Sequence, residues 1–250
     1  GARGLRSVME SILLLQQEKK IVFSMLSNPL KTLTKKEWLL WLCSLFIVLL
    51  SNILAANFDP LTLIAALVGV TSLVFAAKGN VWAQVLMIVF SILYGIISFR
   101  FRYWGEMITY LGMALPMAVW SAITWLRHPA ESGDAVAIQK LNLRQFAGLL
   151  ASCVVVTVLF YRILAALDTP NLAFSTLSVI TSFLAAALTM LRSSYYALGY
   201  AANDVVLIVL WLLASLTNSG YLPVAVNFII FFFNDLYGFI SWKKREVLQA

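Results

Sequence analysis

Amide and carboxylate side chains occur inside long apolar stretches of this sequence. Asn203 and Asp204 lie about nine residues into one such stretch, and Asn227, Asn234 and Asp235 lie in the next. Polar groups buried at bilayer depth are costly, and they usually mark a substrate or ion pathway. Their position predicts a ligand site inside a membrane protein.

Further amide and aromatic residues complete the candidate set. The predicted substrate-binding residues are Gln84, Tyr94, Trp120, Tyr196, Asn203, Asp204, Asn227, Asn234, Asp235 and Tyr237. Amides can bind hydroxyl and amide groups of a ligand, and aromatic faces beside an acid favour a cation. We therefore expect a ligand similar to a cationic nucleoside. Asp204 is expected to lie nearest the cationic ring or to hold a residue that orients the ring, and Trp120 is expected to point inward.

Simpler interpretations compete with this one. Asn, Gln and Ser inside membrane helices often only bond to a neighbouring helix. Glu106 is close in sequence to Arg100 and Arg102 and is expected to pair with them. Tryptophans at the ends of apolar stretches usually belong to interfacial belts, which is the prediction for Trp38, Trp104, Trp125 and Trp242.

The composition favours a membrane protein over a soluble enzyme. Hydrophobic residues make up 62% of the 250 residues and charged ones 12%, whereas soluble domains carry roughly 25% charged residues. The sequence contains no GxxxxGK[ST], GxSxG or HExxH pattern. Neither an ATP-hydrolysing site nor a familiar catalytic centre is therefore predicted. Cys43 and Cys153 lie in apolar stretches and suggest no disulfide or metal site. No cofactor is expected.

Eight apolar stretches are long enough to cross a bilayer, which needs about 20 residues per helix. They lie at Trp38–Ala56, Leu61–Ala77, Val81–Phe99, Trp104–Leu126, Gln145–Leu167, Leu172–Leu191, Tyr195–Thr217 and Tyr221–Trp242. The predicted fold is an all-α integral membrane protein. Residues 37–245 form one transmembrane domain, residues 1–36 an amphipathic N-terminal segment, and residues 246–250 a tail.

The distribution of positive charge predicts the orientation. With eight spans, fifteen of the 18 Lys and Arg residues lie on the side of both termini, and only Arg100, Arg102 and Arg162 lie on the other. Positive loops stay cytoplasmic, so both termini should be cytoplasmic. The same asymmetry explains the net charge of +7 without a nucleic-acid partner.

A weak internal repeat appears when the sequence is shifted by 117 residues. The shift aligns Tyr94 with Trp211, Tyr110 with Asn227, Trp120 with Tyr237, Ser121 with Gly238, and Trp125 with Trp242. Repeat one would cover about 61–127 and repeat two about 171–242, with a linker helix at about 144–167. This is a parallel 3+1+3 plan with one extra N-terminal helix, and parallel repeats in transporters place the substrate at their interface.

Several of these segments resemble the PnuC family. The resemblance rests on 79–84 (GNVWAQ), 90–94 (FSILY) and 103–107 (YWGEM), and on Trp120, Trp125 and Asn203-Asp204. It also includes 234–242 (NDLYGFISW), which is followed by Lys-Lys-Arg, and it covers about residues 38–245. Two departures are Pro116, whose repeat partner is Phe233, and Phe239, where the family pattern has Trp.

The resemblance implies transport of nicotinamide riboside across the bacterial inner membrane by facilitated diffusion with alternating access. A cytoplasmic kinase would trap the substrate by phosphorylating it. The resemblance also implies a SWEET-like architecture and a homo-oligomer, a trimer, in the lipid bilayer. The residues alone leave open a carrier of sugars or of other vitamins or nucleosides, a membrane enzyme or scaffold, and proton coupling through Asp204 or Asp235.

Overall fold

A computed structural model describes residues 2–250, without the side chains of residues 2 and 3. Eight of the helices in this part of the chain are long and apolar enough to cross a membrane, as the sequence predicts. They are α2 (Lys35–Ile53), α3 (Pro60–Ala77), α4 (Trp82–Arg100), the combined helix Trp104–Arg127, α7 (Leu143–Ala166), α8 (Leu172–Met190), α9 (Tyr196–Ser215), and α10 (Leu222–Gln249) with the short η3 turn (Ser219–Tyr221) that precedes it.

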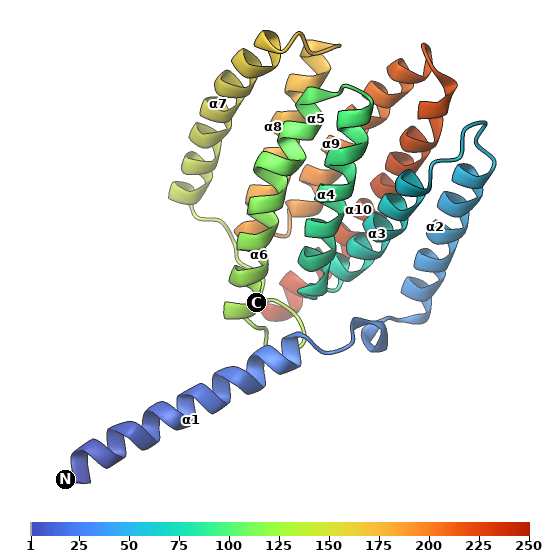
Figure 1. Cartoon of the computed structure of the whole chain (residues 1–250). Coiled ribbons are helices and arrows are strands. Elements are labelled where there is room, and N and C mark those ends of the chain that lie inside the picture. The colour runs from blue at the N-terminus through green and yellow to red at the C-terminus, as the bar shows by residue number, and fades with distance from the viewer. Residues whose placement is uncertain (1) are drawn as a thin grey trace.

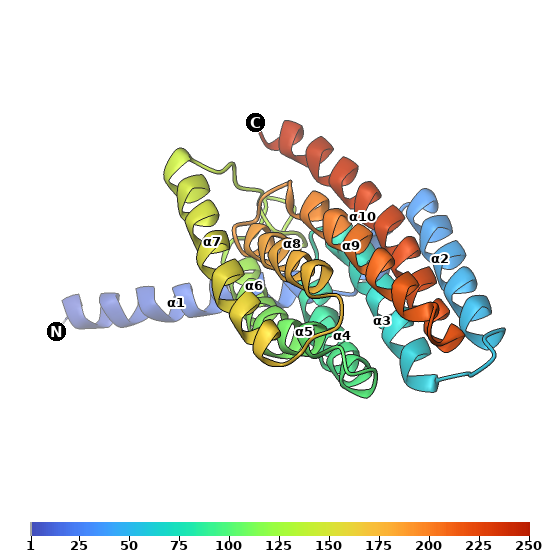
Figure 2. The same ribbon diagram turned by 90° about the horizontal axis from the view of Figure 1, so that it is seen from above.

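The spanning helices stand side by side, with α3, α4, α8, α9 and α10 in the middle (Figures 1 and 2). Helix α2 lies on one outer side and α7 on the other. Both termini lie at the same end of the bundle, which we call the terminal face; the other end is the opposite face (Figure 1). An even number of spans requires this arrangement.

The combined helix contains a wide turn. Helix α5 (Trp104–Thr109) continues through a π-helical turn, η2 (Tyr110–Ala114), into α6 (Leu115–Arg127). Pro116 lacks a backbone N–H, and its ring would collide with a carbonyl of the preceding turn. The wider π turn relieves this conflict and keeps the helix continuous.

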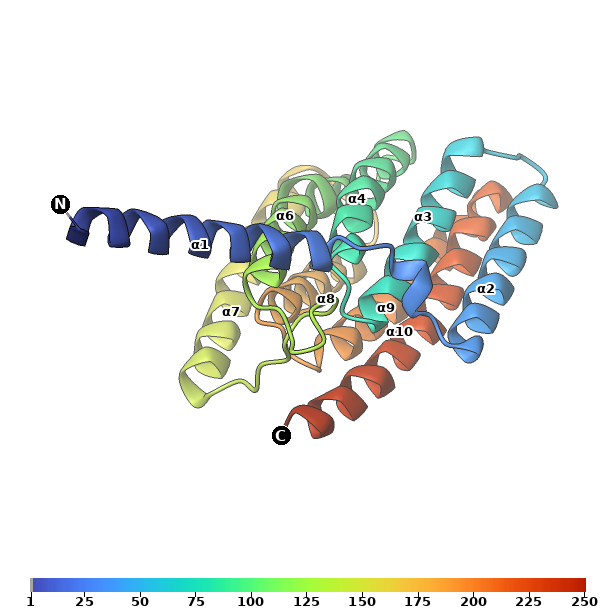
Figure 3. The same cartoon turned by 90° about the horizontal axis from the view of Figure 1, so that it is seen from below.

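The N-terminal segment forms helix α1 (Ala2–Met25), which leaves the terminal face and projects beyond the bundle (Figure 3). Its apolar side chains from Leu5 to Leu15 are largely exposed. The 3₁₀ turn η1 (Pro29–Thr32) connects α1 to α2, and the Trp82 indole donates to the Leu26 carbonyl at 3.0 Å. The end of α1 is therefore attached to the start of α4.

A strap at the terminal face, which we define as residues 129–142, joins α6 to α7. Gly79 follows α3 and Arg192 follows α8, and both have positive φ angles, 69° and 55°. The strap bonds to the carbonyls of both: Val136 N–H to Gly79 and Gln139 N–H to Arg192, each at 2.9 Å. The Arg192 guanidinium donates to the Ala137 carbonyl at 3.1 Å, which helps to hold a left-handed conformation that non-glycine residues seldom adopt. One strap thus links the ends of α3 and α8.

Candidate functional site

A small cavity lies between α3, α4, α9 and α10, with η2 on one side. Its volume is about 40 Å³, and its lining residues are Gly69, Ser72, Leu73, Ala76, Gln84, Met87, Phe90, Tyr110, Tyr196, Tyr200, Asn203, Asp204, Phe228, Phe231 and Asp235. Sites that enclose small ligands typically measure roughly 300–1,000 Å³. The cavity in this conformation therefore has room for a few water molecules, and a nucleoside would require its walls to move apart.

Five of the ten predicted site residues line this cavity: Gln84, Tyr196, Asn203, Asp204 and Asp235. All five side chains are buried, with 5% or less of each exposed. Gln84 comes from α4, the two acids from α9 and α10. The lining places these residues together, and their role as ligands stays a prediction.

Asp204 on α9 and Asp235 on α10 both line the cavity, where these two helices pack against each other. Among the described residues, one Asp204 oxygen has no hydrogen-bond partner. Next to them, the Asn203 carbonyl oxygen accepts a 2.9 Å bond from Thr181 on α8. Two neighbouring acids with spare acceptor capacity make this end of the cavity suited to a cation or to hydroxyl groups.

Aromatic rings form the rest of the wall. Phe90 meets Tyr110 and Phe231 edge-on, at centroid distances of 5.9 and 5.6 Å. Phe231 lies directly against Gly69, because a Cβ added at Gly69 would collide with the Phe231 ring. Glycine at this position thus lets α3 and α10 approach closely enough for the ring to close the cavity.

Several of these lining residues are not among the ten predicted site residues: Met87, Phe90, Tyr110, Tyr200, Phe228 and Phe231. Helical spacing could have found some of them. Tyr196, Tyr200 and Asn203 recur at steps of four and three, as do Asp235, Phe231 and Phe228 in the reverse direction. Such steps place residues on one helix face, so Tyr200 shares the face of two residues that were already candidates.

Tyr94 and Asn227 lie beside the cavity, not in its wall. They line a smaller void of about 10 Å³ that shares Phe90, Phe228 and Phe231 with the main cavity. The Tyr94 hydroxyl accepts a 2.6 Å bond from the Trp211 indole N–H, and the Asn227 carbonyl oxygen accepts a 3.1 Å bond from Asn52 on α2. Both side chains lie closer to the opposite face than the main cavity does.

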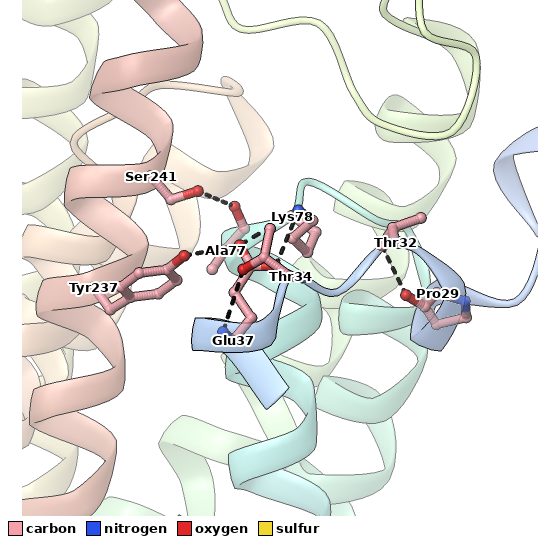
Figure 4. Close-up of polar contacts among 8 residues, drawn as sticks. All are labelled: Pro29, Thr32, Thr34, Glu37, Ala77, Lys78, Tyr237 and Ser241. Atoms are coloured by element: carbon pink, nitrogen blue, oxygen red, sulfur yellow. Dashed lines mark hydrogen bonds and ion pairs between the residues drawn. The ribbon is translucent and has the colours of Figure 1, made fainter. Parts of the chain in front are cut away.

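Asn234 and Tyr237 point toward α2 and away from the cavity, which corrects the prediction that they line it. The Asn234 amide donates to Ser44 at 2.9 Å. The Tyr237 hydroxyl donates to Glu37 at 2.8 Å, and Lys78 pairs with the same carboxylate at 3.1 Å (Figure 4). Glu37 also closes the capping box at the start of α2 with Thr34. These contacts attach the extra helix to α3 and α10.

Trp120 is 56% exposed on the outer surface, so the expectation that it points inward is wrong. Ala118, Ser121 and Trp125 are the buried residues of α6, and they define its inner face. Trp120 lies on the other face of this helix. Its depth could be estimated from hydropathy, but its direction could not.

Glu106 is also placed differently from the expectation. Its carboxylate accepts a bond from Ser178 on α8 and is 1% exposed, whereas Arg100 pairs with Asp59 at 3.3 Å. Glu106 therefore joins the combined helix to α8, and it does not pair with its neighbours in sequence.

Trp125 and Trp242 are fully buried, so their assignment to an interfacial belt is wrong. Their rings pack 5.6 Å apart, and Tyr196 packs on Trp242 at 4.6 Å. The indoles donate to the carbonyls of Thr189 and Ala76, at 3.0 and 2.7 Å. This cluster separates the cavity from the terminal face, as the cluster of Tyr94, Trp211 and Phe228 separates it from the opposite face.

Comparisons with known proteins agree with this architecture. Residues 59–244 match the family described as nicotinamide mononucleotide transporter. The chain is 28% identical to the nicotinamide riboside transporter PnuC of Neisseria mucosa over 196 residues, 75% of this chain and 74% of the relative. It is 25% identical to PnuC of Haemophilus influenzae over 186 residues, 74% and 79% of the two chains. A crystal structure of the vitamin B3 transporter PnuC superposes with a TM-score of 0.75 at 25% identity, covering 87% of this chain and 94% of that one.

Proposed function

Because the chain belongs to the nicotinamide mononucleotide transporter family, we propose that it transports nicotinamide riboside. The observation that carries the proposal is the cavity lining, in which two carboxyl groups lie among aromatic rings and amides. Nicotinamide riboside is a cation with a flat ring, three ribose hydroxyls and an amide. Ring faces attract such a cation, and the attraction is stronger where water is excluded.

The same lining argues against a phosphorylated substrate. Among the described side chains, no Lys or Arg lines the cavity, and a phosphate needs cationic or N–H donors. Asp204 and Asp235 would also repel it. The riboside therefore fits this site better than the mononucleotide, in agreement with the names of the two curated relatives.

Transport would proceed by alternating access and facilitated diffusion. The cavity is too small for a nucleoside and has an aromatic cluster on the side of each face, so the walls and one cluster at a time would open. Phosphorylation by a cytoplasmic kinase would add charge that the two acids disfavour, which would trap the product. The alternative is transport coupled to a proton that Asp204 or Asp235 carries. Uptake measured with and without a pH gradient distinguishes this alternative from facilitated diffusion.

The proposed setting is the bacterial inner membrane, with both termini cytoplasmic. The excess of Lys and Arg on the terminal face supports this orientation. Assembly as a homotrimer stays a prediction from the resemblance.

The testing experiment is calorimetric titration of the purified protein with nicotinamide riboside, nicotinamide mononucleotide and nicotinamide. We expect binding of the riboside and at least tenfold weaker binding of the other two. Preferred binding of the mononucleotide would overturn the charge argument, and binding of none would remove the substrate. Uptake into proteoliposomes with and without a pH gradient, at fixed membrane potential, then tests facilitated diffusion.

A further inference from the structure

A groove outside the transport cavity lies at the terminal face between α7, α8 and the end of α10. Its volume is about 580 Å³, within the range of roughly 300–1,000 Å³ for small-molecule sites. Its lining residues are Gln139, Lys140, Leu141, Phe146, Leu149, Leu184, Leu188, Ser193, Tyr195, Lys243 and Glu246. None of them lines the transport cavity.

The polarity of this groove changes with depth along the helices. Lys140 and Lys243 lie at the terminal face, where α7 begins and α10 emerges. Phe146 and Leu149 follow at one and two turns into α7. A polar mouth above an apolar floor matches a molecule with a charged head and a hydrocarbon chain.

The mouth can hold a phosphate. Lys140 is exposed, and Lys243 lies over the Tyr195 ring at 4.4 Å while pairing with Glu246 at 2.8 Å. The N-terminus of α7, capped by Asn142, lies beside Lys140, and helix N-termini favour anions. Two lysines outnumber the single glutamate, so the mouth keeps a net positive charge.

The apolar floor of the groove lies at the outer surface of the helix bundle. Helix α7 is the least buried of the eight spanning helices and stands at the edge of the bundle (Figure 2). Leu188 and Leu149 are buried, whereas Phe146 is half exposed. An acyl chain entering from the bilayer would cover the Phe146 ring. The exposed apolar surface of the ring would then contact the acyl chain.

We propose that this groove binds a membrane glycerophospholipid, with its phosphate held by Lys140 and Lys243 and one acyl chain against Phe146, Leu149 and Leu184. Basic pockets between spanning helices are known to suit anionic headgroups. The bound lipid would join α7, the start of which is otherwise attached through the strap, to the end of α10. The site is independent of the substrate proposed above.

The test measures lipid binding by native mass spectrometry on the delipidated protein in detergent, with dioleoylphosphatidylglycerol as the probe. Lys140→Gln with Lys243→Gln should weaken binding by roughly fivefold for each lysine. The matched control is Lys31→Gln with Lys244→Gln, which removes two exposed lysines near the same face and should leave binding unchanged. Dioleoylglycerol, which has the same chains and no phosphate, should bind at least tenfold more weakly.

A second variant tests the floor without changing charge. Leu184→Trp fills the groove, so it should weaken binding of the phospholipid by tenfold or more while riboside binding is retained. Equal lipid binding by all variants would overturn the proposal, because it would mean an unspecific lipid coat. A change of oligomer mass in Leu184→Trp, with lipid binding unaltered, would also overturn it and assign the groove to a second copy of the chain.

Discussion

The indole N–H of Trp211 donates a 2.6 Å hydrogen bond to the hydroxyl of Tyr94, and the two residues are 117 positions apart. The same separation relates Trp125 and Trp242, which pack against each other at the terminal face. Residues that are equivalent in two parallel repeats meet only near the axis that relates the repeats. One pair lies on each side of the cavity, as expected if the axis passes through it, while the duplication itself stays a prediction.

Removing both partners of the Tyr94–Trp211 bond should destabilise the protein less than the sum of the two single losses. Trp211→Phe leaves a buried hydroxyl unpaired, and Tyr94→Phe leaves a buried indole N–H unpaired, each at a cost of about 1–3 kcal/mol. The double variant removes both polar groups. We expect its apparent Tm to lie above the value that additive losses give. Strictly additive losses would show that the bond contributes nothing of its own.

Asp204→Asn and Asp235→Asn should each lower the affinity for nicotinamide riboside, by about tenfold or 1.4 kcal/mol. The reason is the loss of a negative charge in the wall of the cavity. The measurement is calorimetric, with the reduced riboside, which lacks the ring charge, as a comparison ligand. Its affinity should change much less.

The control for this pair is Glu131→Gln, which removes an exposed acid from the strap. It should leave both affinities unchanged. An equal loss for charged and reduced riboside in Asp204→Asn would mean that the acid positions the wall and does not attract the cation.

Gly69→Ala should impair the site through Phe231. The new methyl group would meet the Phe231 ring, and such overpacking costs about 1–3 kcal/mol. We expect a lower Tm together with weaker riboside binding. Phe231→Leu in the same chain should restore Tm, because the smaller side chain leaves space for the methyl group. If Phe231→Leu does not restore Tm, the new methyl group at position 69 must collide with a residue other than Phe231.

Tyr237→Phe should lower stability without lowering riboside affinity. The Glu37 carboxylate loses one donor but keeps Lys78 and the backbone N–H of Thr34, so a loss of about 1–2 kcal/mol is expected. Thermal unfolding and calorimetry on the same samples measure the two effects. Trp120→Phe, on the outer surface, is the control and should change neither. A tenfold loss of affinity with unchanged Tm would instead make Tyr237 a ligand.

Hydropathy was sufficient to predict the spanning helices because each one needs a long apolar run, whatever its neighbours are. The candidate site was only partly predictable, because hydropathy gives the depth of a residue and not its direction around the helix. Asp204 and Trp120 have similar apolar surroundings in sequence, yet one lines the cavity and the other faces outward. Asn234 and Tyr237 were misplaced for another reason: α2 lies outside the predicted repeats and needs polar partners of its own. Glu106 shows the same difficulty, since its partner Ser178 is 72 positions away.

The strap between α6 and α7 restricts how α3 and α8 can move relative to each other. It is bonded to the carbonyl groups of Gly79 and Arg192 at the same time, so these two helix ends cannot separate while both bonds persist. Movements that keep the bonds are rotations about a pivot at the terminal face. The displacement of each helix then grows with its distance from that pivot. It is greatest at the opposite face, near Asp59 and Asn218. A few degrees of rotation would change the distance between helix ends most at this face.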